Sequence, residues 1–138
     1  MRIALAQINN TVGDLAANAA KILEFARRAL EQGAELVVFP ELALTGYPPR
    51  DLVEKTSFLE RTADALDSIA AASAHLDLSL IVGYVARSPK DAPIHAQNAA
   101  ALIEYGRIVF KQCKMLLPTY DVFDEARYFQ PASCQRLC

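Results

Sequence analysis

Residues 34–52 read AELVVFPELALTGYPPRDL and contain the pattern that decides the fold. The stretch begins with an apolar, β-branched run, which predicts a buried strand over residues 34–39. A proline and then Glu41 follow at once. Further on, a glycine and a proline pair break both helical and strand periodicity, so residues 44–52 are predicted to form a loop. The stretch therefore places a carboxylate at the carboxyl end of a buried strand.

The residues before this stretch predict an α/β fold. Residues 2–8 have the short apolar pattern of a strand. A helix is expected to begin after Asp14, which is a good N-cap residue, and to end at Gly33. Strand, helix and strand then follow one another within about forty residues, which is typical of a βαβ unit. The strands over 2–8 and 34–39 are therefore expected to pair in parallel.

The rest of the chain continues with helix and strand patterns and ends in a loop. A helical region is predicted over 51–74, a third strand over 78–87, and two strands around a tight turn over 98–113. Residues 114–138 have no clear period and are interpreted as a structured loop. The buried face of the 51–74 helix is predicted to contain Ala63, Leu66, Ile69, Ala70 and Ser73.

Composition limits the class of protein. The chain has 138 residues, of which 53% are hydrophobic and 22% charged, with a net charge of −2, as in soluble globular domains. No basic stripe occurs, so nucleic acid is not expected as a partner. The apolar runs are far shorter than a membrane span, so no membrane association is expected either. Because the start of the chain lacks the pattern of a signal peptide, the cytoplasm is the expected location.

Three charged residues are candidates for chemistry. Glu41 is either a general base held by strand geometry or a capping or salt-bridging glutamate in a loop. Lys114 follows a predicted strand and could stabilise an oxyanion or pair with a buried carboxylate, although most lysines are solvated on the surface. Glu125 could orient a substrate amine or the lysine. The alternative interpretation of Glu125 is a solvent-exposed acid on a loop that aromatic residues hold in place.

The cysteines and histidines give no strong signal. The chain contains Cys113, Cys134 and Cys138, and two histidines. An odd, sparse set of cysteines argues against a disulfide framework, and no spacing resembles a metal site. Neither a metal nor a cofactor is therefore expected in this chain. Cys113 is interpreted as a buried structural cysteine, with an activated thiol as the alternative.

Three stretches, taken in this order, resemble the nitrilase (carbon–nitrogen hydrolase) superfamily. They are RIALAQINNTVGDLAANAAKI (2–22), VVFPELALTGYPPRDL (37–52) and KMLLPTYDVFDEARYF (114–129). The second and third are most similar to the N-terminal glutaminase domain of glutamine-dependent NAD synthetases. The resemblance extends to about Pro131 and implies an α-β-β-α sandwich. Residues 1–138 are expected to form only the N-terminal portion of that domain.

The resemblance also implies a Glu-Lys-Cys catalytic triad. Glu41 matches the general base of the family, and Lys114 matches the triad lysine. Tyr120 matches a position that helps hold glutamine. Glu125 matches a second acid near the lysine, and Tyr47 matches an aromatic residue beside the site.

The nucleophile of the family has no match in this chain. In the family it lies in a motif resembling CED, at the end of another apolar strand. Cys134 comes too early in the sequence for this role. Cys138 is the last residue and has neither the apolar strand before it nor the acid after it. The sequence thus indicates a truncated domain that is inactive alone.

The activity implied by the resemblance is hydrolysis of the side-chain amide of glutamine. The ammonia would pass to a synthetase domain, absent here, that uses ATP and magnesium to make NAD. The full-length enzyme is expected to be a homo-oligomer. Two alternatives remain: another amidase of the same superfamily that acts on a small amide, and an inactive truncated fragment or pseudoenzyme.

Overall fold

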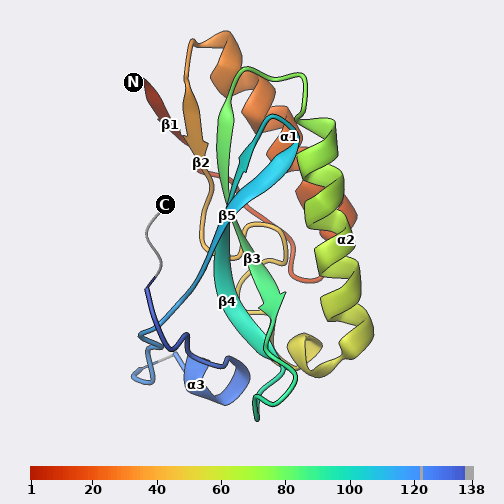
Figure 1. Ribbon diagram of the computed structural model, residues 1–138, viewed down its shortest axis with the longest axis vertical. Helices are drawn as coiled ribbons and strands as arrows, with labels where there is room; N and C mark the ends of the chain where they lie inside the picture. Colours follow the sequence, from red (N-terminus) through yellow and green to blue (C-terminus); the bar gives the residue numbers. More distant parts are fainter. Residues whose placement is uncertain (122, 136–138) are drawn as a thin grey trace.

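The computed structural model describes residues 1–121 and 123–135, in which a five-stranded sheet carries its two long helices on one side (Figure 1). The strands are β1 (Ile3–Leu5), β2 (Leu36–Val38), β3 (Ser79–Arg87), β4 (Ala96–Glu104) and β5 (Arg107–Cys113). The helices are α1 (Leu15–Glu31), the 3-10 helix η1 (Arg50–Glu54), α2 (Thr56–Ala72) and the short α3 (Glu125–Tyr128). The α/β class predicted from the sequence is confirmed.

The strands lie side by side in chain order, β1-β2-β3-β4-β5. The first three are parallel, and Val37 lies opposite both Ala4 and Leu80. The last two are antiparallel to their neighbours, and Gly83 of β3 lies opposite Ala100 of β4. The predicted parallel pairing of the first two strands and the predicted hairpin near the end of the chain are both confirmed.

Helix α1 begins and ends where its capping residues predict. The Asp14 carboxylate accepts a hydrogen bond from the Ala17 amide at 3.1 Å. After the last turn, Gly33 has a φ of +75°, a conformation that favours glycine. Asn18, on the buried face of this helix, donates to the carbonyl groups of Thr11 and Leu44 at 2.8 and 3.0 Å. It therefore ties together the segments that follow β1 and β2.

The helical region predicted over 51–74 is divided into η1 and α2 at Lys55, whose backbone is extended. Four of the five residues predicted for the buried face of α2 are buried. Ala63 is exposed, so the prediction for that residue is wrong. Thr62 is turned inward instead and satisfies its hydroxyl by donating to the Phe58 carbonyl at 2.8 Å. In the described part of the chain, no helix is long and apolar enough to cross a membrane.

The two faces of the sheet have different surroundings. Val37, Leu80 and Val82 are fully buried in the core that the sheet forms with α1 and α2. On the opposite face, the side chains of Ile3 and Leu5 are 53% and 72% exposed. Residues 1–121 and 123–135 thus form one sheet layer and one helix layer. The second sheet and second helix layer of a sandwich are not formed by these residues.

Gly83 allows the segment after β2 to cross β3 at close range. A Cβ atom at this position would lie 2.5 Å from the Leu42 nitrogen and 2.6 Å from the Pro40 oxygen. The Leu44 amide donates to the Gly83 carbonyl at 3.0 Å, so the crossing segment is bonded to the strand. Glu41 lies in the middle of this segment, and its position therefore depends on a strand residue without a side chain.

Replacement of Gly83 by alanine is expected to lower the free energy of unfolding by about 2 kcal/mol. The new methyl group would meet backbone atoms of the crossing segment, which cannot rotate away. Chemical denaturation followed by circular dichroism measures the loss. The control is Ala100→Gly at the paired position of β4, which should cost only about 0.5–1 kcal/mol through backbone entropy. Equal losses in the two variants would contradict the close approach at Gly83.

Candidate active site

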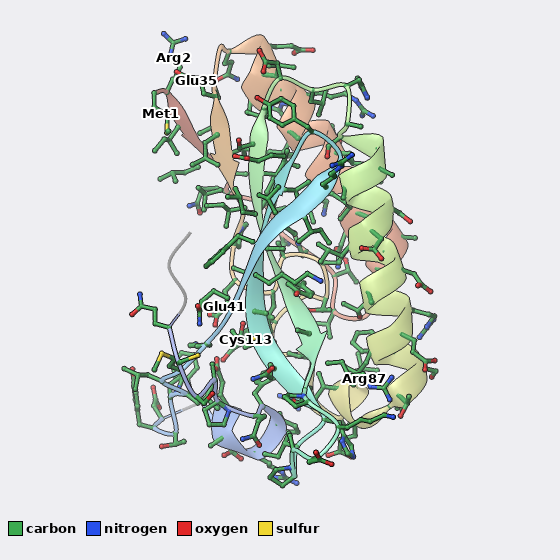
Figure 2. All side chains as sticks on the ribbon, in the orientation of Figure 1. Met1, Arg2, Glu35, Glu41, Arg87 and Cys113 are labelled. Atoms are coloured by element: carbon green, nitrogen blue, oxygen red, sulfur yellow. The ribbon has the colours of Figure 1, made fainter. Side chains whose placement is uncertain are left out.

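Glu41 and Lys114 are in contact, although 73 residues separate them in the chain. Glu41 follows β2, and Lys114 follows β5 directly. The Lys114 Nζ atom lies 2.8 Å from Glu41 Oε1. The pair lies at the end of β5, remote from the Met1–Glu35 end of the sheet (Figure 2). The two residues that the sequence singles out as base and cation thus form one ion pair.

Glu125 is a second carboxylate bound to the same ammonium group. It is the first residue of α3 and is only 3% exposed. Lys114 Nζ lies 3.3 Å from its Oε1 atom and 3.0 Å from its Oε2 atom. Within the described residues, Oε2 has this ion-pair contact but no hydrogen-bond partner. The lysine therefore joins a buried carboxylate to the half-exposed carboxylate of Glu41.

The electrostatic surroundings keep Lys114 charged. Partial burial lowers the pKa of an ammonium group, but the hydrogen bonds and charges of Glu41 and Glu125 outweigh it, so the pKa of Lys114 is raised above its ordinary value. Its side chain is 32% exposed, so one side of the group remains accessible. The result is a fixed cation, held between two anions, that can face a developing negative charge.

Asn98 holds both members of the ion pair and was missed by the sequence analysis. Its side-chain Nδ2 donates to Glu41 Oε1 at 2.6 Å. Its backbone carbonyl accepts a hydrogen bond from the Lys114 amide at 2.7 Å. The residue is 5% exposed and is the third residue of the alanine-rich strand β4. A buried amide needs hydrogen-bond partners, and this requirement is the signal that could have identified it from the sequence.

A row of aromatic rings leads outward from the site. The Tyr47 hydroxyl donates to Glu125 Oε1 at 3.1 Å. The Tyr47 ring lies 6.4 Å from that of Phe123, which lies 5.9 Å from that of Tyr120. Tyr120 is 70% exposed at the outer end of the row. The structure thus brings Tyr47 and Glu125 together with the ion pair and places Tyr120 at the rim.

Tyr47 resists ionisation in this position. Burial, the hydrogen bond to Glu125, and the charges of Glu125 and Glu41 raise the pKa of Tyr47 to about 12. All of these effects disfavour a phenolate, because a phenolate would be poorly solvated and would face two carboxylates. Tyr47 therefore remains a hydrogen-bond donor to Glu125 at any pH at which the site could work.

A fall in stability at alkaline pH is expected from this raised pKa. Tyrosine in an unfolded chain ionises near pH 10. Between pH 10 and 12 the unfolded state loses its proton first, so the free energy of unfolding falls as pH rises. In Tyr47→Phe the fall should be smaller but not abolished, because burial raises the pKa of Tyr84 to about 12 as well. Denaturant unfolding at several alkaline pH values measures the slope, and an unchanged slope would contradict the contact with Glu125.

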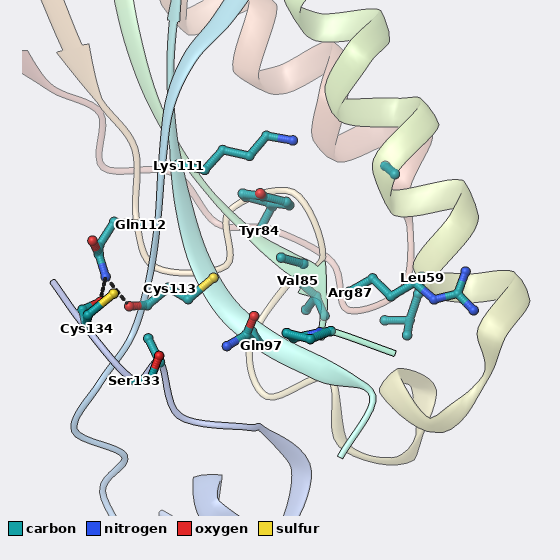
Figure 3. A pocket seen from close by; sticks show the side chains of 14 residues that line it. Leu59, Tyr84, Val85, Arg87, Gln97, Lys111, Gln112, Cys113, Ser133 and Cys134 are labelled. Atoms are coloured by element: carbon teal, nitrogen blue, oxygen red, sulfur yellow. Dashed lines mark hydrogen bonds between the residues drawn. The ribbon is translucent and has the colours of Figure 1, made fainter. Parts of the chain in front are cut away.

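An open hollow of about 370 Å³ adjoins the ion pair. It is lined by Glu41, Asn98 and Lys114 together with residues of β3, β4 and β5 on the uncovered face of the sheet. A larger hollow, of about 450 Å³, contains neither Glu41 nor Lys114 (Figure 3). The smaller hollow is therefore where a substrate would meet both charged groups.

Nearly the whole chain matches one protein family. The family model for carbon-nitrogen hydrolases matches residues 2–136. The chain belongs to the carbon–nitrogen hydrolase family. The family that the motifs indicate is confirmed by this match.

Curated relatives of this carbon–nitrogen hydrolase are much longer than the chain. The glutamine-dependent NAD(+) synthetase of Thermotoga maritima is 41% identical over 131 residues, and that of Synechocystis sp. is 44% identical over 134 residues. Each alignment covers 95% of this chain but only 22% and 24% of the two relatives. The chain thus spans about a quarter of the length of these synthetases.

Solved structures show the same fold in two kinds of enzyme. The glutamine-dependent NAD+ synthetase of Acinetobacter baumannii has a TM-score of 0.81 at 32% identity, and 96% of this chain matches 24% of that one. An amidase from Nesterenkonia sp. has a TM-score of 0.77 at 28% identity, and 97% of this chain matches 49% of that one. In another structure of that amidase, acrylamide has added to the active-site cysteine.

The described cysteines of this carbon–nitrogen hydrolase do not line the hollow beside Glu41 and Lys114. Cys113 is half-buried and packs against the helix-covered core, beside Tyr84 in the larger hollow (Figure 3). Cys134 is exposed, and its carbonyl accepts a hydrogen bond from Gln112 at 3.4 Å. Cys138 lies outside the described residues. Within residues 1–121 and 123–135, no group of His, Cys, Asp and Glu side chains could hold a metal ion.

Proposed function

We propose that this chain supplies the general base and the oxyanion-stabilising cation for hydrolysis of the glutamine side-chain amide, as the ammonia-producing part of a glutamine-dependent NAD synthetase. The observation that carries the proposal is the 2.8 Å contact of Lys114 with Glu41, at the edge of a hollow open to substrate. Sequence similarity to synthetases over 95% of the chain supports the choice of glutamine. In this proposal Glu41 is the base and Lys114 is the cation.

The first half of the proposed reaction forms a thioester. Glu41 takes the proton of a cysteine thiol, and the thiolate attacks the amide carbon of glutamine. The carbonyl oxygen becomes an oxyanion, which the Lys114 ammonium stabilises. Glu41 then gives its proton to the leaving nitrogen, the carbon–nitrogen bond breaks, and ammonia departs. In the second half, Glu41 takes a proton from water, and the hydroxide attacks the thioester carbon. The carbon–sulfur bond breaks, Glu41 returns the proton to the leaving thiolate, and glutamate is released.

The charges of the site suit this sequence of steps. In the resting site the ammonium group is shared between two carboxylates. When Glu41 takes a proton it becomes neutral, and the ammonium loses one of its two anionic partners. The oxyanion that forms next can take the place of that partner. Glu125 takes no part in the proton transfer and keeps the lysine in position.

The thiol in this scheme is proposed to come from a segment outside the chain. Cys113 packs on the helix-covered face, whereas Glu41 lines the hollow on the other face. Cys134 is exposed and is bound through its backbone to Gln112. The presence of an active-site cysteine in the similar amidase supports cysteine as the missing group. For the same reason, the 138-residue chain alone is expected to release no ammonia from glutamine.

The remaining parts of the proposal concern the whole protein. Ammonia would be passed to a synthetase part that uses ATP and magnesium to amidate an NAD precursor. The support is that the longer relatives are glutamine-dependent NAD(+) synthetases, of which this chain covers about a quarter. Tyr120 and Tyr47 are proposed to border the glutamine site. The homo-oligomeric state and the cytoplasmic location stay predictions from the sequence.

A chimera tests the proposed function. The chain replaces the matching 131 residues of the Thermotoga maritima synthetase. NAD formation is then measured with either glutamine or ammonia as nitrogen donor. The expected result is synthesis from both donors, and the ammonia reaction reports that the synthetase part is intact. A chimera that uses ammonia but not glutamine would contradict the proposal. Release of ammonia from butyramide but not from glutamine would favour the alternative amidase function.

A further inference from the structure

We propose that Asn98 is a positioning residue that presents a single oxygen of Glu41, the Oε2 atom, as the proton acceptor. This inference rests on the proposed function, because it assigns a role within the same reaction. It concerns a residue that the family resemblance did not mark. The geometry around the Glu41 carboxylate carries it.

The two oxygens of Glu41 have different surroundings. Oε1 accepts hydrogen bonds from Asn98 Nδ2 at 2.6 Å and from Lys114 Nζ at 2.8 Å. Within the ranges 1–121 and 123–135, both of these hydrogen bonds go to Oε1, and none goes to Oε2. A carboxylate oxygen that already accepts two donors is a poor site for a further proton. The proton from the nucleophile is therefore taken by Oε2.

Asn98 also fixes the other member of the ion pair. Its backbone carbonyl accepts the Lys114 amide at 2.7 Å, so one residue sets the position of both the base and the cation. Asn98 itself lies opposite Val85 of β3 and is 5% exposed. Residues on central strands are held more rigidly than residues on loops. The carboxylate, which comes from a crossing segment, thus takes its orientation from the sheet.

An amide suits this role for a chemical reason. The Nδ2 group can donate to Glu41 but cannot take the proton that Glu41 must carry. The group is neutral, so it does not compete with Lys114 as a counter-ion. A carboxylate at this position would repel Glu41, and an apolar side chain would leave Glu41 free to turn about its last torsion angle, which is broad for glutamate. Only an amide or a comparable neutral donor fixes the carboxylate without entering the proton transfer.

The variant Asn98→Ala in the chimera tests the role. It removes the side-chain donor but keeps the backbone carbonyl that holds Lys114. The kcat of the glutamine-driven reaction is expected to fall about 10- to 100-fold, because the base is no longer oriented. The loss should fall on kcat rather than on the KM for glutamine, because the orientation of the base matters in the proton transfer. The ammonia-driven rate should not change, because that reaction does not use the hollow beside Glu41. The matched control is Gln97→Ala, at the neighbouring position of β4, which is 9% exposed and lines the larger hollow. It should leave kcat unchanged.

A second variant separates positioning from space filling. Asn98→Asp has nearly the same shape as asparagine but cannot donate to Glu41. Its kcat is expected to be at least as low as that of Asn98→Ala. Full activity in Asn98→Asp, an unchanged kcat in Asn98→Ala, or equal loss of the glutamine and ammonia reactions would overturn the inference.

A measurement on the chain itself decides the inference without any activity. The pKa of Lys114 can be followed by NMR of its side-chain ammonium group. In Asn98→Ala, Glu41 is no longer held 2.8 Å from this group, so the raised pKa of Lys114 should fall toward its ordinary value. An unchanged pKa would overturn the inference. The two proposals can fail separately. If the chimera has no glutamine activity but Asn98→Ala still lowers the pKa of Lys114, the proposed function is refuted and the role of Asn98 in positioning Glu41 is retained.

Discussion

Glu41→Gln is expected to lower glutamine-driven NAD synthesis by the chimera at least about 10³-fold and to leave ammonia-driven synthesis unchanged. Glutamine has the same size as glutamate, and its side-chain oxygen can still accept from Asn98 and Lys114. What it loses is the ability to take a proton from the thiol and later from water. Because the same group acts in both halves of the reaction, neither half can compensate for the other.

The ammonia-driven reaction is the internal control of this experiment, because it does not need Glu41. A second variant is the external control. Glu31→Gln changes an exposed glutamate at the end of α1 and should leave both reactions unchanged. Circular dichroism of Glu41→Gln should match that of the unchanged protein. Loss of the ammonia-driven reaction along with the glutamine-driven one would refute Glu41 as the general base.

Lys114→Ala is expected to lower the free energy of unfolding of the chain by about 2–3 kcal/mol, in addition to abolishing glutamine-driven synthesis in the chimera. The variant leaves Glu125, which is 3% exposed, without its cation. An unpaired buried carboxylate is costly because the lost hydration is not replaced. This loss of stability is no larger than the smallest losses usual when one partner of a fully buried ion pair is removed. The reason is that the lysine side chain is 32% exposed and partly screened by solvent.

Two further variants isolate the cause of this loss. Lys111→Ala removes an exposed lysine three residues earlier on the same strand and should change stability by less than about 0.5 kcal/mol. Adding Glu125→Gln to Lys114→Ala should recover part of the lost stability, since the stranded charge is removed. Equal denaturation midpoints for Lys111→Ala and Lys114→Ala would show that the ion pair with Glu125 does not stabilise the fold.

The elements and their order follow from local patterns of the sequence. The βαβ unit was predictable because Asp14 and Gly33 mark the ends of its helix and the strands are short and apolar. The break between η1 and α2 was not predictable from periodicity, since Lys55 interrupts a region without proline or glycine. The exposure of Ala63 was also missed, because alanine fits either face of a helix and a larger residue decides the rotation.

The candidate site could be predicted only in part. Glu41 and Lys114 belong to motifs, so a resemblance to a family identifies them. Asn98 and Gly83 act through contacts between segments far apart in the chain, and neither belongs to one of the quoted motifs. Both nevertheless carry a physical signal. A glycine inside a strand marks a close approach of another backbone, and an amide among alanines must find a partner.

The backbone hydrogen bonds at Lys114 close a loop beside the site. Its amide is bonded to the Asn98 carbonyl at 2.7 Å, and its own carbonyl accepts from the Ala132 amide at 3.0 Å. Residues 115–131 therefore leave and return at the same residue and form a closed loop that carries Glu125. The two ion pairs of the Lys114 ammonium thus connect this loop, through Glu125, to the segment after β2, through Glu41. One side chain therefore fastens the C-terminal part of the described chain to the other end of the site.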